Sequence, residues 1–318
     1  MLPALLPSDM TEDSTATGPD ASALPRGLAW GALGVVAFSL SLPTTQVATR
    51  QLGPVFATSG RATAAALLAL AYLAYRRASL PSRELLPGLL VVAAGVVVGF
   101  PLCTALALQR TDSAHGAVIV GLLPAATAVM GVLRTGERPS RAFWAASGAG
   151  AAAVAVFAVV RGAGLPTTDD GLTVLAVLSA AVGYAEGARL APLLGPDQVV
   201  CWALLLSLPL VVPFLVVDVL RSTPTADAAG WSCFAYTAAV SMLLGFFAWY
   251  RGLALGGVAK VSQVQLAQPL LTVGESVVLF GQRLEPAVVV TAVAVLACVA
   301  AAQRTRVVRP AVPQPCRG

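Results

Sequence analysis

A row of polar side chains crosses a strongly apolar stretch at steps of three, four and three residues: Gln265, Gln268, Thr272 and Glu275. This spacing aligns the four side chains along one side of an α-helix. Two amides, a hydroxyl and a carboxylate in such a row can hydrogen-bond a small polar molecule in a cavity. They can equally bond neighbouring helices to each other. The sequence leaves both uses open.

A second carboxylate, Glu186, lies in the glycine-flanked stretch 183–189, together with Tyr184. Arg189 is three residues further on and can approach Glu186 on the same helical face. One interpretation is an ion pair near the end of a helix. The other is a site for a solute amine or for a proton, since a buried carboxylate can exchange a proton during a cycle. Both stay open.

Three further residue types bear on a site. Arg61 lies about seven positions inside an apolar stretch, so we expect a buried partner for it, such as Glu275 or backbone carbonyls. His115, the single histidine, lies at the start of the expected span 114–133 and is either a loop-facing hydrogen-bonding group or a pH-sensitive one. Pro124 and Pro269 each remove a backbone donor inside an apolar stretch, so we expect helix breaks that line a site.

The segments that must position these residues are too apolar for a water-soluble domain. Hydrophobic residues make up 57% of the 318 residues and charged residues 11%, with mean hydropathy +0.81. A soluble domain carries about 25% charged residues, and about 20 apolar residues span a bilayer as a helix. The sequence therefore predicts an all-α integral membrane protein. The ten expected spans are 27–45, 54–75, 85–108, 114–133, 141–160, 171–190, 198–220, 230–250, 258–280 and 286–303.

The positive charges predict the orientation. Fourteen of the 20 Lys and Arg residues fall on one side of the alternating spans, five fall on the other, and Arg61 lies inside a span. Positively charged loops stay in the cytoplasm, so we expect both termini there, in a cell membrane. Residues 1–25 and 304–318 are then cytoplasmic tails, the first of them disordered. Trp249 and Tyr250, which end the eighth expected span, suggest an aromatic belt at the membrane surface.

Other classes of partner find little support. The net charge of +5 is not gathered into a basic stripe with aromatics, so nucleic acid is not an expected partner. The five cysteines show no C-x-x-C spacing, and we expect no metal site, cofactor or disulfide framework. A membrane-embedded enzyme acting on a lipid-linked or small substrate remains the alternative. The sequence contains no H-E-x-x-H or G-x-S-x-G motif to support it.

The two halves resemble each other at a shift of 145 residues. Pro124 corresponds to Pro269, and Thr127 corresponds to Thr272. We therefore expect two five-helix repeats, at 26–160 and 170–303. Because five is an odd number of spans, the second repeat enters the membrane inverted relative to the first. Carriers that work by alternating access use this arrangement, with the solute site between the repeats.

The segment 106–140, with Pro124 inside it and Gly136-Glu137-Arg138-Pro139-Ser140 at its end, resembles the signature of EamA-type carriers of the drug/metabolite transporter superfamily. Trp30-Gly31, Arg61 and the stretch 252–257 fit the same pattern. The resemblance covers about residues 27–303. It implies a ten-helix inverted-repeat fold and export of amino acids, metabolites or drugs. Gly281-Gln282 departs from the Gly-Glu that the second repeat usually carries, unless Glu285 replaces that carboxylate.

These observations together predict a secondary transporter that exports a small organic solute by alternating access. Coupling to protons is a hypothesis that rests on the buried carboxylates. The expected partners are the solute and the lipid bilayer, and homodimer formation is left open.

Overall fold

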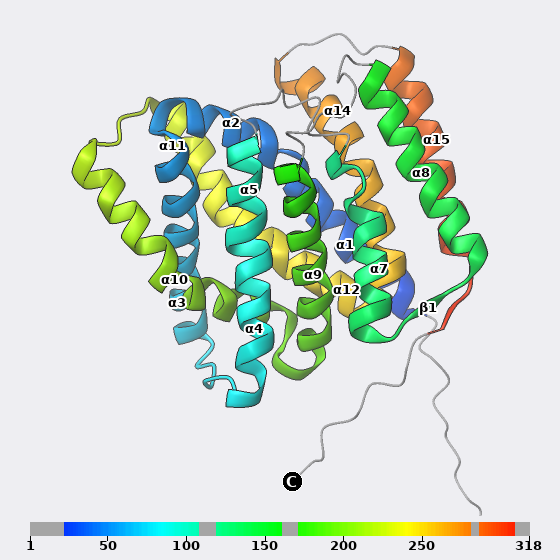
Figure 1. Ribbon diagram of the computed structural model, residues 1–318, viewed down its shortest axis with the longest axis horizontal. Helices are drawn as coiled ribbons and strands as arrows, with labels where there is room; N and C mark the ends of the chain where they lie inside the picture. The colour runs from blue at the N-terminus through cyan, green and yellow to red at the C-terminus, as the bar shows by residue number, and fades with distance from the viewer. Residues whose placement is uncertain (1–21, 108–118, 161–170, 281–285, 309–318) are drawn as a thin grey trace, which may run out of the picture.

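The computed structural model describes residues 22–107, 119–160, 171–280 and 286–308, and these residues are mostly helical (Figure 1). The α-helices are α1 (Ala23–Ser39), α2 (Ser41–Leu52), α3 (Arg61–Tyr75), α4 (Leu86–Val92), α5 (Phe100–Ala107), α7 (Leu123–Thr135), α8 (Arg141–Val160), α9 (Gly171–Leu194), α10 (Pro196–Arg221), α11 (Ala228–Ala235), α12 (Gly245–Gly256), α13 (Val258–Ser262), α14 (Gln268–Phe280) and α15 (Pro286–Arg304). Shorter π and 3-10 turns join several of them: η1 (Phe56–Gly60), η2 (Arg83–Leu85), η3 (Ala93–Gly99), η5 (Tyr236–Leu244) and η6 (Gln263–Ala267).

Six stretches within the described residues are long and apolar enough to cross a membrane: Ala23–Leu52, Phe56–Tyr75, Arg83–Thr104, Gly171–Leu194, Pro196–Arg221 and Ala228–Gly256. The protein is therefore an all-α, multi-pass membrane protein. The other four expected spans overlap α7, α8, α14 and α15. Each of these lies close to residues outside the described ones, so the count of ten stays a prediction.

The outer faces of the helices are apolar, as contact with lipid requires. Large hydrophobic side chains are exposed along several helices, among them Leu33, Leu67, Leu90, Leu175, Phe214, Val293 and Leu296. Soluble monomers rarely expose apolar surface on this scale. The exposed side chains therefore face the hydrocarbon of a bilayer.

Glycines set the packing between α1 and α12. A Cβ atom added to Gly252 would lie 2.6 Å from the backbone nitrogen of Gly31 and 2.9 Å from the carbonyl oxygen of Gly27. The two backbones therefore touch, and no larger residue fits between them. Inside a bilayer, where burying apolar groups gains little, such close van der Waals contact is what holds helices together.

The contact between η3 and α9 also depends on glycines, and it is the repeat-related counterpart of the contact between α1 and α12. There Gly95 and Gly183 face each other, and a Cβ atom on Gly183 would lie 2.5 Å from a methyl group of Val96. In the order of the ten expected spans, the first meets the eighth and the third meets the sixth. Exchanging the two halves converts one pair into the other. The pairs α3–α10 and α8–α15 obey the same exchange, and α8 and α15 run side by side in Figure 1.

The expected aromatic belt at the end of the eighth span is wrong. Trp249 and Tyr250 are fully buried, because α12 continues to Gly256 and places both rings inside the bundle. The Tyr250 hydroxyl donates a hydrogen bond of 3.2 Å to the carbonyl oxygen of Gly183. Only the neighbouring Arg251 is exposed, where its guanidinium lies 4.8 Å from the centre of the Trp30 ring.

A short strand pair fastens the last described residues to the loop after α7. Strand β1 (Arg138–Pro139) pairs antiparallel with β2 (Val307–Val308), and the Ser140 amide donates to the carbonyl oxygen of Arg306 over 3.1 Å. In Figure 1 this pair lies at the bottom of the bundle, whereas α2 lies at the top. The strand pair therefore marks one end of the bundle, and α2 marks the other.

Candidate functional site

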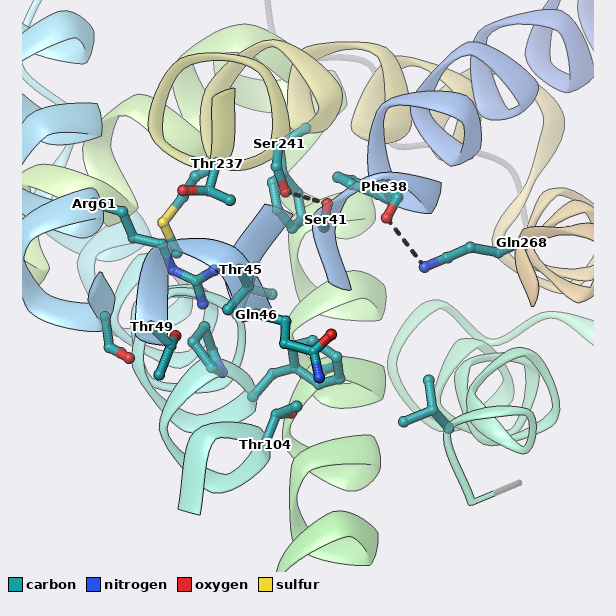
Figure 2. Close-up of a pocket in the computed structure, with 18 of the residues that line it drawn as sticks. Phe38, Ser41, Thr45, Gln46, Thr49, Arg61, Thr104, Thr237, Ser241 and Gln268 are labelled. Carbon is teal, nitrogen blue, oxygen red and sulfur yellow. Dashed lines mark hydrogen bonds between the residues drawn. The ribbon is translucent and has the colours of Figure 1, made fainter. Parts of the chain in front are cut away.

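A cavity of about 530 Å³ lies between the two halves, at the level of α2 (Figure 2). Both halves contribute to its wall, the first through α1, α2, η1, α3, η3, α5 and α7 and the second through α9, η5, α12, η6 and α14. Hydroxyl groups form much of the polar lining: Ser41, Thr45, Thr49, Thr58, Thr104, Thr237 and Ser241. A cavity of this size fits a small organic molecule.

A break in the first span shapes the cavity. Pro43 has no N–H to donate to the carbonyl of Ser39, and its ring clashes with that carbonyl, so the helix is interrupted at Leu40. The second half satisfies the carbonyls that the break leaves. Thr272 donates to the Ser39 carbonyl oxygen over 2.8 Å. The Gln268 amide donates to the Phe38 carbonyl oxygen over 3.4 Å, as Figure 2 shows. Irregular backbone at membrane depth requires such partners.

The polar row Gln265, Gln268, Thr272 and Glu275 lies where the two halves of the chain meet. Gln265 and Gln268 line the cavity and bond to each other, from Nε2 to Oε1, over 3.2 Å. Thr272 and Glu275, one and two turns further along α14, contact α1 instead. The hydroxyl of Ser39 donates to Glu275 Oε1 over 2.5 Å. The whole row therefore faces the other half of the chain, and its first two members reach the cavity.

Arg61 and Tyr184 also line the cavity. The sequence suggested Glu275 or backbone carbonyls as the partner of Arg61, but Arg61 Nη1 donates a hydrogen bond to the hydroxyl of Thr45, over 3.1 Å. Figure 2 shows the guanidinium turned toward Thr45. Tyr184 is buried and packs on two aromatic rings, with centroid distances of 6.0 Å to Phe246 and 5.4 Å to Trp249.

The two prolines of the repeat lie just after breaks rather than in mid-helix. Pro124 is the second residue of α7 and follows a turn at Gly121-Leu122. Pro269 is the second residue of α14 and follows the 3-10 turn η6. Both positions suit proline, because the first residues of a helix have no intrahelical use for their N–H groups.

Glu186 does not line the cavity. Its carboxylate is 2% exposed and lies between two arginines. Arg189 Nη2 is 2.6 Å from Oε1, and Arg134 Nη1 is 3.2 Å from Oε2. Because Arg134 lies in the last turn of α7, close to β1, this ion cluster lies at the end of the bundle opposite α2. Of the two readings of Glu186, the structure shows the ion pair. His115, Gly281, Gln282 and Glu285 lie outside the described residues.

Glu137 makes a contact that was not predicted from the sequence. It is 3% exposed, and its two oxygens accept hydrogen bonds from the backbone N–H groups of Val258 and Ala259, over 2.8 and 2.7 Å. These N–H groups begin α13, directly after Gly257, whose φ of 89° starts the new helix. A carboxylate at a helix N-terminus is favoured by unpaired donors and by the helix dipole. The sequence signals were the Gly-Glu pair and the glycine before α13.

The polar lining from α2 was also missed. The expected first span ended at residue 45, whereas the helix runs to Leu52 and brings Gln46, Thr49 and Arg50 to the cavity. The signal was present in the polar residues of Ser41–Leu52, which are spaced as one helical face.

Comparison with known proteins agrees with this architecture. The model of the EamA-like transporter family matches twice, at residues 25–159 and 170–302. The chain is 46% identical over 274 residues to the "Uncharacterized transporter YdeK" of Bacillus subtilis (strain 168), covering 86% of this chain and 96% of that protein. One solved crystal structure matches with a TM-score of 0.72 at 18% identity, over 89% of this chain and 98% of the other, which shows a shared fold. The two matched segments span both halves of the bundle and meet at the cavity, and the chain therefore belongs to the EamA-like transporter family.

Proposed function

We propose that the protein is a secondary transporter that exports a small organic solute across the cell membrane by alternating access. The observation that carries this proposal is the cavity of about 530 Å³ between two matched repeats. Its wall combines hydroxyls and amides with aromatic rings, the mixture that fixes the orientation of a small ligand. Paired repeats around a central site are the usual framework for alternating access.

The conformation fits one state of such a cycle. The cavity lies at the α2 end, whereas the Arg134–Glu186–Arg189 cluster and the Glu137 contact with α13 lie at the end marked by β1. The excess of arginine and lysine expected at this second end supports a cytoplasmic position for it. In this proposal the structure is the outward-facing state, with both chain termini in the cytoplasm. Opening inward then requires the ion cluster to separate.

Glu275 is a better candidate for proton coupling than Glu186. In the described residues Glu275 Oε1 accepts one hydrogen bond, from Ser39, while Oε2 is buried without a hydrogen-bond partner. Glu186, in contrast, faces two arginines. Charge at membrane depth is costly without a partner, so a carboxylate in the position of Glu275 can gain and lose a proton as the bundle moves.

Transport is tested by counterflow in proteoliposomes, with solutes first selected in a growth-protection screen of amino acids, metabolites and toxic analogues. Wild-type protein should exchange a selected solute above the rate of empty vesicles. Ser241→Trp fills the cavity and should lower exchange about tenfold or more. Ser232→Trp places the same ring on an exposed position of α11 and should leave exchange unchanged. Wild-type exchange in the Ser241 variant would overturn the assignment of the cavity as the solute site.

A further inference from the structure

We propose that Arg61 binds the carboxylate of the transported solute, and that the rest of the solute is apolar or aromatic. This inference rests on the proposed transport function and specifies its substrate class. An organic monoanion is the ligand that the charges and surfaces of the cavity wall complement.

The guanidinium of Arg61 has unused hydrogen-bonding capacity. An arginine carries five N–H donors in a planar fork that matches a carboxylate. In the part of the chain that the structure describes, one donor bonds the hydroxyl of Thr45, and the Nε atom is buried without a hydrogen-bond partner. The ion pairs among these described residues join Glu186 to Arg134 and Arg189 and do not include Arg61. A cation inside a membrane bundle needs a counter-charge or a water-filled cavity, and a bound carboxylate supplies the counter-charge.

The charge of the cavity wall also favours an anionic solute. Among the described residues that line the cavity there is no Asp or Glu, while Arg61 and Arg50 are both present. Arg50 is exposed near the end of α2, where it can attract an anion toward the cavity. A solute ammonium would meet two positive charges here without a carboxylate to bind it. The wall therefore selects against cations and favours anions.

The remaining surface favours an organic anion over a small inorganic one. Phe38, Phe246 and Tyr184 line one part of the cavity and pack on each other, with 4.9 Å between the centroids of Phe38 and Phe246. Rings of this kind bury the apolar body of a ligand. Gln265 Oε1 and Thr104 Oγ1 are buried without a hydrogen-bond partner in the described residues and can bond a polar substituent on that body.

The test uses purified full-length protein and matched acid, amide and amine ligands. The probes are hexanoate, 3-phenylpropionate and N-acetylphenylalanine with the corresponding amides, together with hexylamine, 3-phenylpropylamine and inorganic phosphate. Dissociation constants come from ligand-dependent thermal stabilisation. We expect at least one acid to bind about tenfold or more tightly than its amide, because the charge-assisted bond is lost in the amide. Amines and phosphate should bind more weakly than that acid.

Variants assign the preference to Arg61. Arg61→Gln should reduce the acid-to-amide preference to within about twofold while amide binding persists, because the neutral amide does not need the cation. Arg61→Lys keeps the charge but loses the planar fork and should retain part of the preference. Arg221→Gln removes an exposed arginine at the end of α10 and should change nothing. If Arg61→Gln does not fold, the Lys variant is used instead. A reduced acid-to-amide preference in Arg61→Lys then supports the inference, and an unchanged preference overturns it.

Three outcomes would overturn the inference: no acid exceeds its amide, the preference survives in the Gln variant, or phosphate binds as tightly as the best acid. Failure of the transport proposal is recognised separately. If a neutral or cationic solute is exchanged in the counterflow assay, and Arg61→Gln exchanges it at the wild-type rate, transport stands and the substrate class falls. If no solute is exchanged while acids still bind through Arg61, the transport proposal fails and the assignment of Arg61 as a carboxylate-binding residue stands.

Discussion

The hydroxyl of Ser39 donates a hydrogen bond of 2.5 Å to the carboxylate of Glu275, joining the broken first span to the polar row of α14. One residue belongs to the first repeat and the other to the second. Glu275 lies about two helical turns along α14 from Gln268, which lines the cavity. A change in the charge of Glu275 is therefore placed to alter how the two repeats meet beside the site.

Replacing Glu275 with Gln should separate coupling from solute exchange. The amide keeps the shape and can still accept from Ser39, but it cannot release a proton. We expect flux driven by an imposed pH gradient to fall about tenfold or more while counterflow exchange persists. Both rates are measured in proteoliposomes at equal protein density. Glu84→Gln, at an exposed acid on η2, is the matched control. Unchanged gradient-driven flux in the Glu275 variant would remove this residue from coupling.

Glu186→Gln should affect stability more than solute selection. It leaves Arg134 and Arg189 without their shared carboxylate, but both arginines are more than 40% exposed and water screens them. We therefore expect a loss of about 1–2 kcal/mol of unfolding free energy, less than for a fully buried pair. Thermal unfolding in detergent measures it. Full stability together with lost gradient-driven flux would instead return Glu186 to the coupling role that the sequence left open.

Adding one methyl group to the seam between α1 and α12 should be costly. In Gly252→Ala the new Cβ meets backbone atoms of Gly31 and Gly27, which cannot move aside as a side chain can. We expect a loss of about 1–3 kcal/mol of unfolding free energy. Gly148→Ala is the control, because nothing lies within 4 Å of a Cβ at that position in α8. Equal melting temperatures for the two variants would contradict the close packing of α1 on α12.

Asp227 should make the start of α11 sensitive to acid. It caps this helix, and the hydrogen bond of 2.7 Å from the Gly230 amide is the main reason that its pKa lies below the ordinary value of 3.8. Because the folded pKa is lowered, the charged cap stabilises the protein above the unfolded value. That stabilisation is lost as the pH falls through the folded value. Asp227→Asn caps without titrating, so the difference in melting temperature from wild type should shrink between pH 6 and pH 3. A constant difference would exclude this cap as the cause.

Helical periodicity and the internal repeat predicted several features that the structure contains. The spacing of Gln265, Gln268, Thr272 and Glu275 identified one face of one helix, and the structure places that face against the other half of the chain. The 145-residue shift placed Pro124 and Pro269 at related positions, and both follow breaks in their helices. Such features depend on residues within a few turns of each other, so a single sequence contains them.

What the sequence could not give was the identity of the neighbour. Arg61 bonds Thr45 on α2, and Glu186 meets Arg134, which is 52 residues away in the chain. Trp249 and Tyr250 looked like surface aromatics because their local context ended in Arg251. They are buried because glycines of α1 and α9 leave space for their rings. These outcomes depend on which helices pack together, and the pattern of one helix does not encode its partner.

The packing of α1 on α12 also means that α1 is synthesised well before the helix it packs against. The glycine face of α1 is among the first parts of the chain to be made, yet its partner glycines in α12 follow about 220 residues later, a delay of about 10–45 s at about 5–20 residues per second. During that interval α1 must persist in the bilayer as a separate helix with its backbone groove unoccupied. The first repeat thus completes its packing only when the second arrives, so a ribosome that stalls between the repeats leaves a helix with an exposed glycine groove, ready to pair with whatever small-residue helix lies nearest.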